Sequence, residues 1–273
     1  MKLALATPTP EVKTTVPVAL LSGSFSERMQ KAAHLGYDGV ELMVVRPDEL
    51  SVEEIRTQVS QAGLEVAAIA TGAIYMTDQI TLLASDPDLS RQAATRLEAL
   101  IDLAAALQAP IVTIGSFRGR LAWAGGPKAR EKLAEILRMG AEKAMRQDVR
   151  LVLEPVNRYE GDIVLTAEEG LGMIEEVGHS HLGLLLDTYH VNIEETSLTA
   201  PFRQAMAAGR LWHVHLGDSN RLPPGQGHLD FPGIVAALHA SGYQGYLSAE
   251  LLARPDPDTA AEATIKYMRK LMP

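Results

Sequence analysis

The sequence predicts a single (β/α)8 barrel over residues 1–273, within the α/β fold class. Short apolar segments rich in β-branched residues alternate eight times with longer segments of helical periodicity, as βα units around a buried parallel sheet do. The length of 273 residues is close to the roughly 250 that one such barrel needs. No glycine-rich turn follows the first apolar segment, which argues against an open dinucleotide-binding sheet. These observations favour closure of the eight units into one barrel.

Four strands are expected in the first half of the chain, each a short apolar run: residues 2–6, 39–44, 65–70 and 111–114. The first helix is expected to begin near Ser24, because Ser24 and Glu27 have the spacing of a capping box, and to end at Gly36. Ser51 and Glu54 form a second such pair at the start of the second helix. Alanine- and leucine-rich segments predict the next two helices over residues 89–107 and 127–146.

The second half repeats the pattern, with strands expected over residues 150–154, 183–187, 211–216 and 245–250. A third capping-box pair, Thr166 and Glu169, marks the start of the fifth helix. The seventh helix is expected to follow Asp230 and to end before Gly242. The sixth and eighth helices are expected over residues 201–208 and 259–271.

Composition excludes several classes of protein. The formal net charge of -9 and the pI near 5.4 argue against a nucleic-acid partner, since phosphate binding needs a positive surface. The absence of cysteine excludes disulfides and thiolate metal sites. No apolar run approaches the ~20 residues of a membrane span, and the first residues contain too short an apolar stretch for a secretory signal. We therefore expect a cytoplasmic protein with no membrane partner.

Acidic side chains end three of the expected strands. Glu154, Asp187 and Glu250 each close an apolar run, and the active sites of β/α barrels lie at these carboxyl ends. Three carboxylates at one barrel mouth repel each other, and a divalent cation with His215 as a neutral fourth ligand would compensate them. Three oxygens and one imidazole suit Mn²⁺, Co²⁺, Mg²⁺ or Fe²⁺, with Zn²⁺ as a further alternative. The sequence therefore predicts one divalent metal site.

Each of these residues also has a structural interpretation. An acidic residue at a strand end is often a hydrogen-bonded group or a helix cap rather than a ligand. His213 and His215 point to the same side of their strand, because strand side chains alternate, and only one of them need be a ligand. His213 lies deeper, and its alternative is a hydrogen-bonded core histidine. Asp187 with His190 is a stronger pair than either glutamate alone.

Four segments together resemble the xylose-isomerase-like barrel superfamily, in particular its ketose 3-epimerase branch, typified by D-tagatose and D-psicose 3-epimerases. They are residues 153–160 (LEPVNRYE), 186–190 (LDTYH), 213–221 (HVHLGDSNR) and 225–228 (GQGH). The resemblance extends over almost the whole chain. It includes residues 36–42 (GYDGVEL), a pattern that is widespread in the superfamily.

The resemblance implies roles for seven residues. Glu154 and Glu250 would be metal ligands that also act as acid/base catalysts, with Asp187 and His215 as the other two ligands. The residues that would contact sugar hydroxyls are Glu160, His190 and Arg221. It also implies one Mn²⁺ or Co²⁺ ion, a small-molecule sugar substrate, and a homodimer or homotetramer.

The chemistry of such a site is physically reasonable. Epimerisation beside a carbonyl requires removal of a proton from carbon, and a metal ion stabilises the resulting enediolate by several kcal/mol. One carboxylate removes the proton and another returns it, and each positioned acid/base group contributes about 10²–10⁴-fold in rate. The strands that end at Glu154 and Glu250 are well separated around a barrel, so these carboxylates can flank a sugar.

Several alternatives are open. Within the superfamily they are an isomerase of the hydroxypyruvate or inositol-pathway type, and a sugar-phosphate epimerase whose phosphate is received by Arg118 and Arg120. The other interpretation of these arginines is a solvated basic loop. An apurinic-site endonuclease would carry extra histidines at residues 69–72 and 114–117, which are absent here. A non-catalytic sugar-binding barrel is the last. Tyr75, Trp123 and the proline-rich loop over residues 8–17 are candidates to cover the site.

Overall fold

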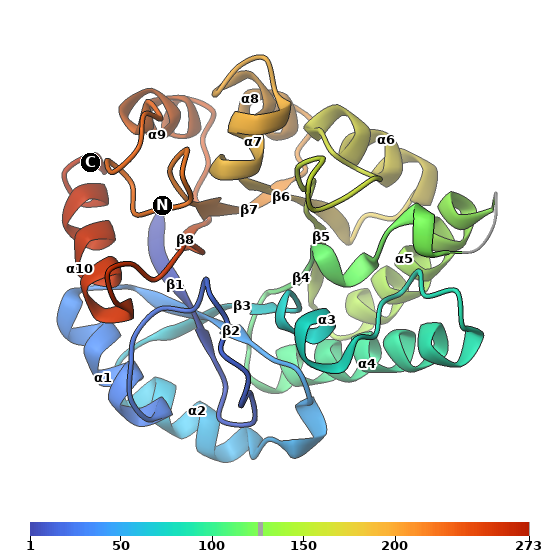
Figure 1. Ribbon diagram of the computed structural model, residues 1–273, viewed down its shortest axis with the longest axis horizontal. Coiled ribbons are helices and arrows are strands. Elements are labelled where there is room, and N and C mark those ends of the chain that lie inside the picture. The colour runs from blue at the N-terminus through green and yellow to red at the C-terminus, as the bar shows by residue number, and fades with distance from the viewer. Residues whose placement is uncertain (125–127, 273) are drawn as a thin grey trace.

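The computed structural model describes residues 1–124 and 128–272, and its eight strands close into one parallel barrel (Figure 1). Neighbouring strands follow the order of the chain, and β1 pairs with β8 to complete the ring. The predicted fold class is therefore confirmed. The strands are β1 (Lys2–Pro8), β2 (Gly39–Met43), β3 (Glu65–Ala70), β4 (Ile111–Ile114), β5 (Arg150–Leu153), β6 (Leu182–Asp187), β7 (Leu211–Leu216) and β8 (Tyr246–Ala249).

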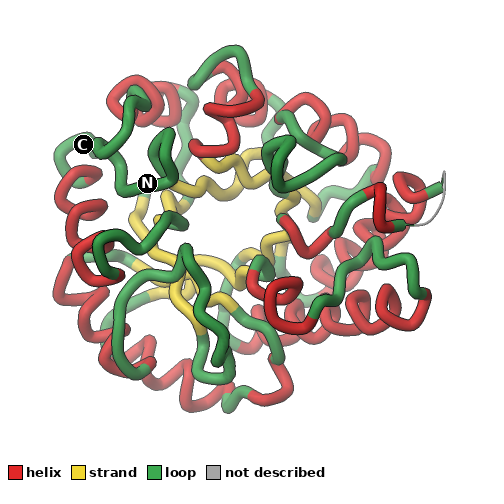
Figure 2. Tube along the Cα trace, viewed as in Figure 1, coloured by secondary structure: helices red, strands yellow, loops and turns green. Residues whose placement is uncertain are grey.

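Helices surround this ring of strands on the outside (Figure 2). The α-helices are α1 (Phe25–Leu35), α2 (Val52–Gln61), α3 (Ala73–Asp78), α4 (Pro87–Ala106), α5 (Ala129–Arg146), α6 (Ala167–Val177), α7 (Thr188–Glu194), α8 (Ala200–Ala207), α9 (Phe231–Ala240) and α10 (Pro257–Met268). Three 3₁₀ turns are η1 (Pro47–Glu49), η2 (Ser116–Arg118) and η3 (Leu121–Trp123). The short helices α3 and α7 were not predicted, and the predicted helix start at Pro127 lies outside the described residues.

The three predicted helix starts are correct, but only one is a full capping box. The hydroxyl of Ser24 accepts from the Glu27 amide, and the Glu27 carboxylate accepts from the Ser24 amide. Ser51 and Thr166 each accept from the amide three residues later without the reciprocal bond. Near Thr166, the Glu169 carboxylate accepts instead from the amide of Leu165, at 2.8 Å.

Side-chain alternation along the strands decides what faces the barrel interior. On β5, Leu151 and Leu153 belong to the large apolar core between the strands and the helices. Val152 faces the other way, into a small apolar cluster with residues of three other strands inside the barrel. The residue two positions after Val152 is Glu154, so its side chain faces the same interior at the barrel mouth. The same alternation brings Asp187 there after Leu185.

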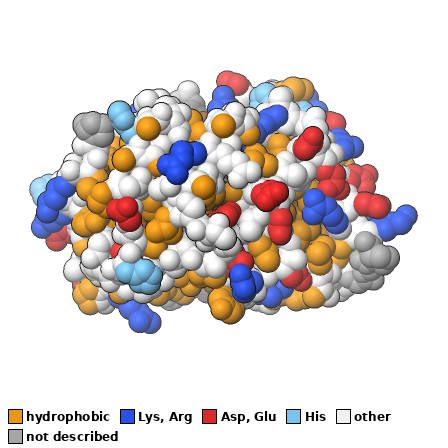
Figure 3. All heavy atoms as spheres, turned by 90° about the horizontal axis from the view of Figure 1, so that it is seen from above, with side chains coloured by type: hydrophobic (Ala, Val, Ile, Leu, Met, Phe, Trp, Pro, Cys, Tyr) orange, Lys and Arg blue, Asp and Glu red, His pale blue; other side chains and the backbone are white. Residues whose placement is uncertain are grey.

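The face of the molecule seen from above in Figure 1 carries side chains of mixed character. Acidic and basic side chains are interspersed with exposed apolar ones on the face shown in Figure 3. Within the described residues, none of the helices combines the length and the apolar character that crossing a membrane requires.

Candidate metal centre

Four predicted ligands converge at the carboxyl ends of β5 to β8. Glu154, Asp187, His215 and Glu250 are all buried, and one potential ligand atom from each lies within 4.8 Å of the others. His215 Nδ1 is 3.5 Å from Glu154 Oε1 and 3.6 Å from Glu250 Oε2. The structure thus brings together residues that are separated by up to 96 positions in the chain, from 154 to 250.

The donor atoms of this cluster fit a divalent cation. Glu154 Oε1, Asp187 Oδ2 and His215 Nδ1 are buried and have no hydrogen-bond partner among the described residues. Leaving a buried polar atom unpaired costs about 1–3 kcal/mol, and three such atoms lie in one cluster. Asp187 divides its oxygens, because Oδ1 caps α7 by accepting from the Tyr189 amide at 2.7 Å. Three carboxylate oxygens and one imidazole nitrogen suit a divalent first-row metal ion or Mg²⁺.

The protonation of the cluster follows from its burial and its mutual charges. Burial raises the pKa of Asp187 to about 7, and it raises the pKa of Glu154 with help from the neighbouring Glu250. Burial also disfavours the charged form of Glu250, but His215 and Arg221 outweigh it and lower that pKa to about 2. For His215, the charges of Glu41 and Glu250 outweigh burial and raise the pKa well above its usual value.

Metal affinity is expected to increase as pH rises through about 7. Asp187 must lose its proton to bind a cation, and His215 must lose a proton from Nδ1, so both groups make binding weaker at low pH. Each released proton contributes up to about tenfold in affinity per pH unit. Calorimetric titration with Mn²⁺ at pH 6, 7 and 8, in buffers of different ionisation enthalpy, measures both the affinity and the protons released. An affinity that is flat over this range would contradict the assignment of the ligands.

A cavity of about 210 Å³ opens beside the cluster. Its polar side is lined by the predicted substrate-binding residues Glu160, His190 and Arg221 together with ligands of the cluster. Its apolar lining includes Val16, Pro17, Val18, Met43, Ala73 and Met76. The proline-rich loop therefore contributes to the cavity as expected. Tyr75 and Trp123 instead stack on each other, 4.9 Å apart, and neither is among the described lining residues.

Arg221 connects two carboxylates across the cavity. Its Nη1 is 3.1 Å from Glu160 Oε1, and its Nη2 is 3.2 Å from Glu250 Oε2. The residue has a left-handed backbone, with φ of 59°, in the loop that follows β7. The buried carboxylate of Asp218 holds this loop by accepting from the amides of Ser219, Gly225 and Leu229. Arg221 is thus fixed as a cation that points towards the ligand cluster.

Asn157 determines which nitrogen of His190 carries a proton. The Oδ1 of Asn157 accepts from two backbone amides, so its Nδ2 is the donor that lies 2.8 Å from His190 Nδ1. The backbone amide of Asn157 donates to the same Nδ1 at 3.3 Å. His190 therefore carries its proton on Nε2, which faces the cavity and lies 3.9 Å from Glu154 Oε1. Burial, reinforced by Arg221, lowers the pKa of His190 well below its usual value and keeps it a neutral donor.

Arg118 has a different role from the one proposed for phosphate binding. Arg118 is 1% exposed. It is therefore neither part of a solvated basic loop nor free to bind a phosphate. Nη1 donates to the carbonyls of Gly115 and Glu154, and Nε and Nη2 donate to those of Ile163 and Val164. The guanidinium thereby joins the ends of β4 and β5 to the following loop, and it fixes the backbone of Glu154.

Arg118→Lys is expected to destabilise the protein by about 3 kcal/mol. A lysine cannot reach the same set of carbonyls, and at least two of them would be left buried without a donor. Urea unfolding measures the loss. Arg91→Lys is the matched control, since Arg91 is largely exposed and its replacement should change stability by less than about 0.5 kcal/mol. Equal stability of the two variants would contradict the structural role of Arg118.

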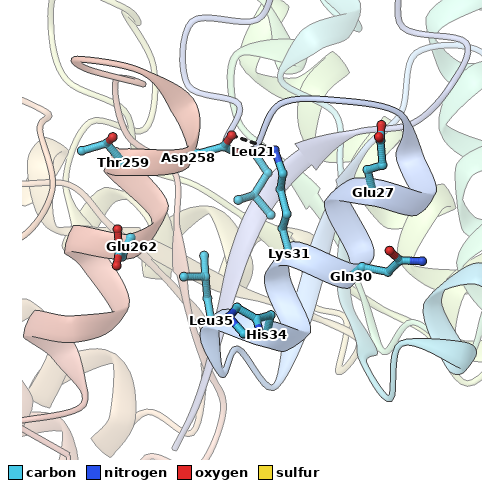
Figure 4. A pocket seen from close by; sticks show the side chains of 9 residues that line it. All are labelled: Leu21, Glu27, Gln30, Lys31, His34, Leu35, Asp258, Thr259 and Glu262. Carbon is cyan, nitrogen blue, oxygen red and sulfur yellow. Dashed lines mark hydrogen bonds and ion pairs between the residues drawn. The ribbon is translucent and has the colours of Figure 1, made fainter.

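A second hollow, of about 480 Å³, lies between α1 and α10 (Figure 4). Its charged groups already have structural partners. Lys31 pairs with Asp258 at 2.7 Å, Glu262 pairs with Lys266, and Glu27 belongs to the capping box of α1. We therefore locate the functional site at the barrel mouth and not in this hollow.

Comparisons with known proteins agree with the barrel fold. The model of a family described as "Xylose isomerase-like TIM barrel" matches residues 29–271. The D-psicose 3-epimerase of Enterocloster bolteae is 31% identical over 259 residues, which cover 91% of this chain and 83% of that protein. The 3-dehydro-D-guloside 4-epimerase of Escherichia coli is 29% identical over 255 residues, which cover 89% and 93%.

A similar barrel is also present among solved structures. A structure described as L-ribulose 3-epimerase superposes with a TM-score of 0.82 at 25% identity, and the alignment covers 99% of this chain and 94% of that chain. The similarity thus extends over essentially the full length of both chains.

Proposed function

Because the chain belongs to the xylose isomerase-like TIM barrel family, we propose that it is a divalent-metal-dependent ketose 3-epimerase. The observation that carries this proposal is the pair of glutamates, Glu154 and Glu250, which lie on separate strand ends and share one ligand cluster with Asp187 and His215. The similarity to a D-psicose 3-epimerase at 31% identity supports inversion at C3 of a ketose.

The two glutamates would exchange protons with the substrate from opposite faces. One carboxylate takes the C3 proton, the C–H electron pair forms the C2–C3 double bond, and the carbonyl oxygen takes the negative charge. The other carboxyl group then returns a proton to C3 from the opposite face. A divalent cation at the cluster would polarise the carbonyl and stabilise the enediolate. In the metal-free cluster, the pKa of Glu154 is raised by burial, whereas that of Glu250 is lowered by His215 and Arg221, so the two carboxyl groups hold a proton with different affinity.

Other side chains of the cavity would orient the sugar. His190 presents an Nε2–H to the space beside Glu154, where it can donate to a substrate oxygen as negative charge develops there. Arg221 and Glu160 form an ion pair that also lines the cavity, with a donor and an acceptor for hydroxyl groups. The apolar wall formed by Val16, Pro17 and Met76 would exclude water from the reacting carbon.

A phosphorylated substrate is the less favoured alternative. Arg118 is buried on backbone carbonyls, and Arg120 Nη2 donates to the Tyr159 carbonyl at 2.7 Å. Of the described residues that line the cavity, Arg221 is the only arginine or lysine, and it is already paired with Glu160 and Glu250. A phosphate dianion would meet mainly carboxylates here. We therefore favour an unphosphorylated sugar.

The proposal is tested by hydrogen exchange. Metal-stripped protein and protein loaded with Mn²⁺ or Co²⁺ are incubated in D₂O with a panel of free ketoses and ketose phosphates. We expect deuterium at C3 of a free ketose only in the loaded protein, together with the C3 epimer as product. Mass spectrometry and NMR locate the label. Label at C4 would indicate that the enzyme inverts C4 and not C3. The absence of exchange with every sugar would exclude ketose epimerisation.

A further inference from the structure

We propose that Glu41 is a positioning residue that fixes the tautomer of His215 and so directs its Nδ1 lone pair towards the metal. Glu41 lies on β2, which pairs with β1 and β3, so its contact with β7 crosses the barrel interior. Its side chain is 0% exposed. His215 Nε2 lies 3.0 Å from Glu41 Oε1 and 3.1 Å from Oε2. The inference rests on the proposed metal-dependent function.

The chemistry of the carboxylate decides which nitrogen carries the proton. An ionised carboxylate only accepts hydrogen bonds, so the Nε2 atom that faces it must be the donor. His215 Nδ1 is then left without a hydrogen in the neutral ring. This nitrogen has no hydrogen-bond partner among the described residues and lies 3.5–3.6 Å from Glu154 Oε1 and Glu250 Oε2. The ring is therefore prepared to ligate through Nδ1, and Glu41 also raises its basicity as a ligand.

His213 holds the carboxylate in place. Its Nε2 lies 2.8 Å from Glu41 Oε2, so two imidazole N–H groups from one strand converge on one buried glutamate. His213 is fully buried, and its Nδ1 does not take part in the ligand cluster. This arrangement accounts for the first histidine of the His-x-His strand, His213, which supports the ligand histidine His215 through Glu41.

Glu41→Gln tests the inference because glutamine has the shape of glutamate but replaces one of its two acceptor oxygens with an NH₂ donor. In either orientation of the glutamine amide, its NH₂ group takes the place of an oxygen that now lies 3.0–3.1 Å from His215 Nε2, so it opposes a proton on that nitrogen. We expect the affinity for Mn²⁺ to fall by about 10–100-fold in calorimetric titration, with one ion per chain retained. At saturating Mn²⁺, kcat should recover much of its wild-type value, unlike kcat of a catalytic glutamate variant. Glu65→Gln, at the amino end of β3, is the matched control and should leave the affinity unchanged.

The outcomes separate this inference from the proposed function. Equal Mn²⁺ affinity in Glu41→Gln and the wild type would overturn the role of Glu41 and leave the metal centre intact. Two ions per wild-type chain would also overturn it, because Glu41, His213 and His215 would then hold a second ion themselves. A wild type that binds no divalent ion would instead reject the proposed function, and this inference with it.

A second measurement needs no variant. In the Zn²⁺-loaded wild type, long-range ¹H–¹⁵N correlation spectra of histidine report the protonated nitrogen of each ring. We expect His215 to carry its proton on Nε2, with the shift of a strong hydrogen bond. A proton on Nδ1 of His215 would overturn the inference, even if Glu41→Gln failed to fold.

Discussion

Replacing Glu154 with glutamine is expected to reduce epimerisation by about 10²–10⁴-fold, and replacing Glu250 should have an effect of the same size. The amide can still ligate a cation through its oxygen, but it cannot carry a proton between the sugar and solvent. Initial rates of product formation at saturating Mn²⁺, with metal content checked in each variant, measure the loss. Glu168→Gln is the control, because Glu168 is exposed on the first turn of α6.

Isotope exchange makes this prediction sharper. If the two carboxylates act on opposite faces, each single variant keeps one of them. The variant should then exchange the C3 hydrogen of one epimer with D₂O and fail to invert the centre, and the other variant should do so with the opposite epimer. Retention of epimerisation within tenfold in both variants would contradict the assigned roles.

The ligand cluster was predictable because it depends on strand ends. An acidic residue directly after an apolar run marks the barrel mouth, and alternation along the strand determines which side chain faces inwards. For Glu154, Asp187 and Glu250 these two regularities suffice. Strands β5 and β8 end at Leu153 and Ala249, one residue before their predicted ends. The side chains of Glu154 and Glu250 still face the barrel mouth.

The features that escaped prediction depend on contacts between distant segments. The sequence predicts that Arg118 lies in a basic loop. In the structure, residues 163–164 cover its side chain, and its guanidinium donates to their carbonyls. Asn157 is one residue of a motif in the sequence, and no pattern there indicates that its side-chain amide contacts His190, 33 positions later in the chain. The helices α3 and α7 have six and seven residues, too few for a periodic pattern to identify them.

In the proposed mechanism the same residues bind the metal ion and exchange protons, and neighbouring side chains hold both glutamates in place. The loop held by Asp218 presents Arg221 to Glu250, and Arg118 holds the backbone of Glu154, so each glutamate is fixed by a different arginine. Preorganisation of this kind lowers the reorganisation that the reaction would otherwise require.

Removal of the metal is expected to abolish epimerisation and to lower the thermal stability of the protein. Without a cation, Glu154, Asp187 and Glu250 lie together in a buried cluster with unpaired donor atoms. A ligand that binds only the folded state at 100 times its Kd stabilises it by about 2.7 kcal/mol. Dialysis against a chelator, followed by calorimetry and activity assays before and after addition of Mn²⁺, Co²⁺, Mg²⁺, Fe²⁺ or Zn²⁺, measures both effects.

The stoichiometry of reloading distinguishes the family alternatives. We expect one ion per chain, with Mn²⁺ or Co²⁺ restoring the highest activity, because four ligand atoms form a single cluster. Asp187→Asn should weaken binding, since it removes a charge from the cluster and retains the cap on α7 through its side-chain oxygen. A count near three ions would instead favour the endonuclease type. We expect no activity in the chelated protein, because the described carboxylates of the cavity cannot neutralise an oxyanion. Full activity there would exclude enediolate stabilisation by a metal ion.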